Sequence, residues 1–143
     1  MTESMFQLPK SRWRRFGLFA LAVVFVLAGI NHFLNPDVYI AIMPPYLPAH
    51  RALVYVSGFF EILGGLAVLP RATRAAAGWG LVLLLLAIYP ANVHMAFHPE
   101  QFAEAPAWAL YARLPLQFVL MVWAYRATRS DAPASMIDMD SRG

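Results

Sequence analysis

Four long apolar segments dominate the sequence, at residues 16–34, 52–69, 75–96 and 106–126. Each has about 18–22 residues, and a helix of that length, rising about 1.5 Å per residue, crosses a hydrocarbon layer about 30 Å thick. Backbone groups inside lipid must find their hydrogen-bond partners within the segment, so we expect helices rather than strands. The sequence therefore predicts an all-α fold, a four-transmembrane-helix bundle at 16–127. A basic cytoplasmic N-terminus at 1–15 precedes it, and a flexible cytoplasmic tail at 128–143 follows.

The composition excludes several classes of protein. Of the 143 residues, 60% are hydrophobic and 13% are charged, whereas soluble domains are about half apolar and about a quarter charged. The chain has no cysteine, which excludes disulfide frameworks, thiol–disulfide catalysis and Cys-ligated zinc or iron–sulfur centres. The net charge is +3, but the basic residues lie beside apolar segments and do not alternate with base-stacking aromatics. We therefore expect the lipid bilayer as a partner and no nucleic acid.

The basic residues predict the orientation of the bundle. Nine of the 11 Lys and Arg residues lie on one side of the expected helices: Lys10, Arg12, Arg14, Arg15, Arg71, Arg74, Arg126, Arg129 and Arg142. Because cytoplasmic connections are enriched in Lys and Arg, both termini and the turn at 70–74 are expected in the cytoplasm, with 35–51 and 97–105 outside. The basic start and first apolar segment also resemble a signal peptide. No clean A-x-A cleavage site follows, and we expect the segment to be retained.

The first outer connection is rich in proline and is expected to contain a short helix. Asn35 can cap this helix, Pro36 suits its first turn, and Asp37 lies near the positive end of its dipole. Pro44 and the proline after it must end the helix. Its apolar face predicts a position at the membrane interface, where it is either a lid over the bundle or an interfacial anchor.

Polar residues within the apolar segments are the candidate site. They are the charged Glu61 and Arg113, with Asn31, His32, Asn92, His94 and Gln117. Such residues are costly in a bilayer and normally face the interior of a bundle. On the predicted topology they converge on the outer half of the bundle, while the inner half is apolar. Glu61 shares a stripe of its helix with Ser57, Gly58, Gly64 and Gly65, so it is expected to face protein rather than lipid.

The predicted positions of Glu61 and Arg113 along their helices place them within reach of each other, so we expect them to form a pair. Two interpretations of this pair remain open. It either fixes helix packing or handles a substrate or proton, since buried pairs often contribute little net stability. His32 is likewise either a hydrogen-bonded interface residue or a chemical group. His94 and His98 are spaced i, i+4 but lack a neighbouring Glu motif, and we expect no metal site.

Four stretches of the sequence resemble the DoxX family of small bacterial four-helix membrane proteins. They are AGINHFLNPDVYIAIMPPYLP, SGFFEILGGLAVLPRATRAAAGWG, YPANVHMA and ARLPLQ. The resemblance implies a multi-pass protein of the bacterial inner membrane with an association with redox metabolism. The family's polar motif positions correspond here to Asn31, His32, Glu61, Asn92 and Arg113.

The resemblance implies an accessory subunit of a quinone-linked membrane oxidoreductase. The candidate catalytic cluster is then Glu61, Arg113 and His32, in which Glu61 handles protons with Arg113 as its partner. His32, Asn31 and Asn92 are expected to hydrogen-bond a quinone head group, and Glu61, Arg113 and Gln117 are further candidates for ligand binding. No cofactor is intrinsic to the chain, and any redox role needs a bound quinone or a partner. Expected protein partners are oxidoreductase subunits and a second copy in a homo-oligomer. Two other functions remain open: a transporter or binding protein for a small molecule or lipid, and a non-catalytic assembly protein.

Overall fold

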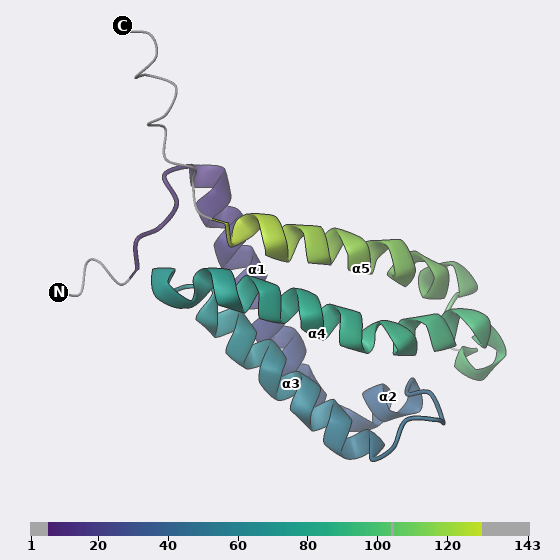
Figure 1. The fold of residues 1–143 in the computed structure, drawn as a ribbon. Coiled ribbons are helices and arrows are strands. Elements are labelled where there is room, and N and C mark those ends of the chain that lie inside the picture. The colour runs from purple at the N-terminus through teal and green to yellow at the C-terminus, as the bar shows by residue number, and fades with distance from the viewer. Residues whose placement is uncertain (1–5, 104, 130–143) are drawn as a thin grey trace, which may run out of the picture.

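The computed structural model describes residues 6–103 and 105–129, and within them the regular secondary structure is entirely helical. The elements are α1 (Arg12–Leu34), α2 (Pro36–Ala41), α3 (His50–Ala67), α4 (Arg71–Phe97), the 3-10 helix η2 (Pro99–Phe102) and α5 (Ala107–Ala127) (Figure 1). The predicted all-α fold is therefore confirmed.

The long helices coincide with the four apolar segments but differ from them at their ends. α1 begins at Arg12 rather than at residue 16, and α4 begins at Arg71 rather than at residue 75. An apolar run marks the part of a helix suited to lipid, whereas helical backbone continues into the polar residues beside it. Of the tail expected at 128–143, residues 130–143 lie outside the described residues. Thr128 is buried, with 1% of its surface exposed, so this residue is not part of a flexible tail.

Three helices, α1, α4 and α5, are long and apolar enough to cross a membrane. Their outward faces are apolar, as in an integral membrane protein. α3 has 18 residues, but these include His50, Arg51 and Glu61, which reduce its mean hydropathy. The chain thus has the composition and helices of a membrane protein, with three helices rather than four meeting the length and hydropathy of a span.

The apolar core lies at the end of the molecule opposite α2, where α1 begins and α5 ends (Figure 1). It contains Leu18, Leu21, Phe25, Leu81, Leu85, Met121 and Ala124. The other end, which carries α2, is called the α2 end below. There α1 and α4 finish and α3 and α5 begin, and there the candidate polar residues gather. Burial of the core side chains fixes how the helices pack around this polar region.

The short helix expected after Asn35 is confirmed as α2, with Pro36 and Asp37 in its first turn. The predicted cap does not form, because the Asn35 side chain makes no hydrogen bond to the helix. Its Nδ2 instead donates to Oδ1 of Asn31, 2.7 Å away. Asp37 also pairs with Arg51 at 3.1 Å, an exposed contact that joins α2 to the start of α3.

Candidate functional site

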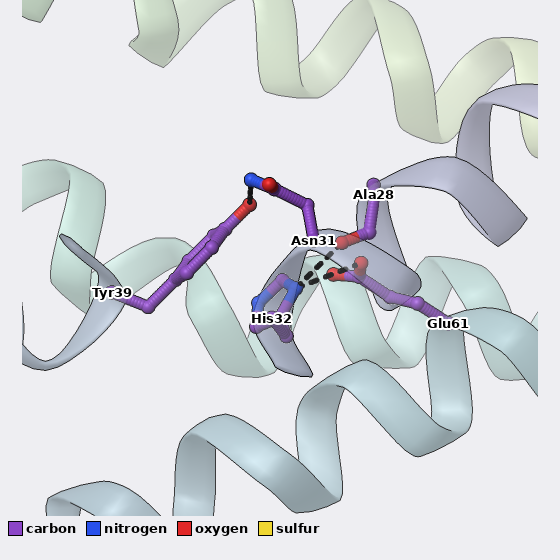
Figure 2. A network of polar contacts seen from close by, with 5 residues as sticks. All are labelled: Ala28, Asn31, His32, Tyr39 and Glu61. Atoms are coloured by element: carbon purple, nitrogen blue, oxygen red, sulfur yellow. Dashed lines mark hydrogen bonds and ion pairs between the residues drawn. The ribbon is translucent and has the colours of Figure 1, made fainter. Parts of the chain in front are cut away.

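A buried histidine and a buried glutamate meet at the α2 end. His32, in the last turn of α1, has 7% of its surface exposed, and Glu61, in the middle of α3, has 4% exposed. Nδ1 of His32 lies 3.5 Å from Oε2 of Glu61 and 2.9 Å from the carbonyl oxygen of Ala28 (Figure 2). Oε2 of Glu61 has no hydrogen-bond partner within the described residues. The predicted orientation of Glu61 toward protein is thus confirmed.

Glycines allow α1 and α3 to approach closely enough to bring this pair together. A Cβ atom added to Gly58 would lie 2.6 Å from Cβ of His32 and 2.9 Å from the carbonyl oxygen of Gly29. One turn further along α3 lies Glu61, so the same face of the helix carries the small residue and the acid. Close approach of small residues is a common way to join helices in lipid. Here it directs the carboxyl group toward α1.

Tyr39 of α2 fixes the imidazole of His32 from the other side. The two rings are stacked, with centroids 3.7 Å apart and planes inclined by 21°. The Tyr39 hydroxyl accepts a hydrogen bond of 2.7 Å from Nδ2 of Asn31 (Figure 2). The sequence did not indicate this role, because Tyr39 lies beyond the turn at Asn35 and has no fixed helical register with His32. Only the folding of α2 back onto α1 brings the two rings together.

A pocket of about 390 Å³ opens beside His32. Apolar side chains of α3, α4 and the segment after α2 form most of its wall, including Ile42, Met43, Val54, Leu84 and Ile88. The polar groups in the wall are His32, Tyr39, Ser57, Asn92 and Arg113. Mostly apolar walls with a few polar groups are typical of small-molecule sites. This arrangement suits an amphipathic molecule with an apolar body and a hydrogen-bonding head group. Ile42 and Met43, which follow α2, form part of this wall, and the contact does not distinguish the expected lid from an interfacial anchor.

The expected pair between Glu61 and Arg113 is not formed. Nη1 of Arg113 instead lies 3.7 Å from Sδ of Met95, and the ionisable side chain beside the Glu61 carboxyl is that of His32, at 3.5 Å. The reason is the helix order: α3 packs against α1, α2 and α4, whereas α5 packs against α4 and α1. The small-residue face of α3 turns toward α1, and Glu61 turns with it. The prediction that Glu61 faces protein was correct, but the prediction that Arg113 is its partner was wrong.

The remaining candidates divide into two groups. Asn92 and Gln117 are hydrogen-bonded to each other, and Gln117 also donates to the carbonyl oxygen of Leu85. Asn92 lines the pocket, whereas Gln117 is buried, with 3% exposure, and is not one of the lining residues. The rings of His94 and His98 lie 4.4 Å apart at the end of α4, outside the residues that line the pocket. Among the described residues, no group of three or more His, Asp or Glu side chains could hold a metal ion.

Comparison with known proteins gives a family but no characterised relative. No curated protein and no solved structure matches the chain. One family model matches residues 21–128, a range that includes Glu61 and every residue that lines the pocket, from His32 to Arg113. The chain therefore belongs to the family described as a domain of unknown function, DUF8561.

Proposed function

We propose that the protein is a DoxX-like accessory subunit of a quinone-linked oxidoreductase in the bacterial inner membrane, and that it binds a quinone-type head group in the pocket. The observation that supports a quinone-type ligand is the pocket itself. Its volume of about 390 Å³ and its apolar wall suit one substituted ring with the start of an isoprenoid tail. Asn92 and Arg113 offer N–H donors to the oxygens of such a ring, and the imidazole of His32 lies in the same wall. The resemblance to DoxX proteins motivates the oxidoreductase partner.

The proposal includes α3 as a fourth transmembrane helix. The face of α3 opposite Glu61 is exposed and carries large apolar side chains: Phe59, Phe60, Leu63 and Leu66. A transmembrane helix that carries an acidic residue must turn that residue toward protein and its apolar face toward lipid, as α3 does here. With four spans, both termini lie on the same side of the membrane. The distribution of Lys and Arg favours the cytoplasm for that side, which places the pocket in the outer half of the bundle.

Direct binding to the purified protein tests the proposed ligand. The protein is placed in lipid nanodiscs and titrated with a quinone that carries a short alkyl tail, with calorimetry as the readout. Ala91→Trp introduces an indole from α4 into the pocket wall and should weaken binding by at least about tenfold. Ala112→Trp on α5 is the matched control, because Ala112 is exposed and outside the pocket. Loss of binding in Ala91→Trp alone supports the proposal, and equal binding by both variants and the parent contradicts it.

A second ligand class, a phospholipid head group, is favoured by one feature of the pocket. Arg113 is one of the residues that line the pocket, and guanidinium groups bind phosphate through paired hydrogen bonds. Native mass spectrometry of protein released from mild detergent distinguishes the two classes by the mass of the retained molecule. Retention of phospholipid in the parent but not in Ala91→Trp would favour a lipid-binding function over quinone binding.

A further inference from the structure

The environment of His32 determines which ring nitrogen carries its proton. Nδ1 lies 2.9 Å from the carbonyl oxygen of Ala28, and a carbonyl oxygen can only accept a hydrogen bond. Nδ1 must therefore be the donor. Oε2 of Glu61 lies 3.5 Å from the same nitrogen, so the carboxyl group and the carbonyl both face the Nδ1 edge of the ring (Figure 2). A carboxyl group beside one ring nitrogen is a common means of fixing a histidine tautomer.

The opposite nitrogen is therefore left as a hydrogen-bond acceptor. In a neutral imidazole with its proton on Nδ1, Nε2 carries a lone pair. Within the part of the chain that the structure describes, Nε2 of His32 makes no hydrogen bond and is not fully buried, and His32 lines the pocket. Stacking against Tyr39 prevents the ring from turning freely. The pocket wall thus holds an oriented acceptor without a partner.

A second pocket group also lacks a partner. Oγ of Ser57, one turn before Glu61 on α3, is buried and makes no hydrogen bond among the described residues. A serine hydroxyl both donates and accepts. Buried polar atoms in proteins nearly always have partners, and an exception calls for an explanation such as a bound molecule. Because Oγ of Ser57 is buried, it reaches a molecule in the pocket only if the side chain turns, and the accessible acceptor of the wall is Nε2 of His32.

We infer that the pocket selects the reduced form of its ligand, a hydroquinone, through a hydroxyl that donates to Nε2 of His32. This inference rests on the proposed function and specifies the ligand further. The hydroxyl of a hydroquinone supplies the proton that Nε2 lacks. Both oxygens of an oxidised quinone are carbonyls, which cannot donate and so leave Nε2 unpaired. Glu61 is a positioning residue, because it acts on the ligand only through the orientation of His32.

Three ligands with the same ring and tail test this selection: the hydroquinone, the quinone and the dimethyl ether of the hydroquinone. Reductant can be added freely, because the chain contains no cysteine. We expect the hydroquinone to bind the parent protein about tenfold more tightly than either other ligand. His32→Phe keeps a ring against Tyr39 but removes both nitrogens, and should bind all three ligands equally. Equal binding of quinone and hydroquinone by the parent overturns the inference and leaves the proposed function intact. Failure of all three to bind overturns the proposed function itself.

A spectroscopic measurement tests the tautomer and the role of Glu61 independently of affinity. Histidine labelled with ¹⁵N reports the proton on each ring nitrogen, and the signals that His32→Phe removes belong to His32. We expect the proton on Nδ1 in the parent, with hydroquinone shifting the Nε2 signal. Glu61→Gln should reduce the preference for hydroquinone over quinone, whereas Glu100→Gln, at an exposed position in η2, should not. A proton on Nε2 of the parent, or an unchanged preference in a folded Glu61→Gln, contradicts the inference.

Discussion

Oε2 of Glu61 lies 3.5 Å from Nδ1 of His32, and this contact joins α3 to α1. Both side chains are buried, and the imidazole also contacts the backbone of Ala28 and the ring of Tyr39. The buried acid is therefore part of the α1–α3 interface rather than a link to α5. Its effects on stability should depend on residues of α1 and be independent of Arg113.

The two members of the pair should be energetically coupled. His32→Phe and Glu61→Gln each remove one side of the contact, and we expect each to lower the free energy of unfolding by about 1–3 kcal/mol. The double variant should lose less than the sum of the two, by about 0.5–3 kcal/mol, because the contact can be removed only once. Thermal unfolding in one detergent provides the comparison.

The control for this cycle combines Glu61→Gln with Arg113→Met. These residues do not contact each other, so their losses should add to within about 0.5 kcal/mol. Coupling of Glu61 to Arg113, with additivity between Glu61 and His32, would show that the charged groups are arranged differently in the membrane.

The close approach of α1 and α3 should be sensitive to one methyl group. In Gly58→Ala the new Cβ would lie 2.6 Å from Cβ of His32, so the helices must separate. We expect a loss of roughly 1–3 kcal/mol, typical of overpacking, together with weaker ligand binding in the pocket beside His32. Gly80→Ala on α4 is the matched control, since no atom lies within 4 Å of its added Cβ. The control should be neutral or more stable by up to about 1 kcal/mol, because alanine favours helix. Equal effects of the two substitutions would contradict the close helix contact.

Arg74 should stabilise the connection between α3 and α4 more than its neighbour Arg71. The buried guanidinium of Arg74 donates to the carbonyl oxygens of Val68, Leu69 and Gln7, whereas Arg71 is exposed and donates to the side chain of Gln7. Arg74→Met leaves these carbonyls without their donor and should cost about 2–3 kcal/mol. Arg71→Met should cost less than about 1 kcal/mol. Thermal unfolding of the two variants provides the test, and a larger loss in Arg71→Met would contradict the assignment.

Single cysteines test whether α3 crosses the membrane, since the native chain has none. Ala41→Cys in α2 and Ala72→Cys at the start of α4 both place a thiol at an exposed position. With four spans, a membrane-impermeant maleimide added to intact cells should label position 41 and not position 72. Permeabilised cells should show labelling of both, which controls for accessibility. Labelling of both positions from the same side would mean that α3 does not span the bilayer.

The length and periodicity of the apolar segments, read from the sequence alone, determined which parts of this protein form helices and which helix faces are buried. The apolar segments located the four long helices, because the bilayer requires a helix of fixed length whatever its neighbours are. The residues Asn35, Pro36 and Asp37 located α2, since turn and helix-start preferences act within a few residues. The small residues beside Glu61 also indicated which face of α3 is buried, a property that depends on helical geometry only.

The partners of the polar residues were decided by the tertiary structure. Nothing within α3 specifies whether its buried face meets α1 or α5, because both helices offer polar and small residues to it. That choice depends on how the glycines of α1 and α3 and the apolar core at the opposite end pack together. It placed His32 rather than Arg113 beside Glu61, and it brought Tyr39 against the imidazole from a separate helix. Contacts between distant segments arise from packing of the whole bundle, whereas local sequence sets only the helices that take part.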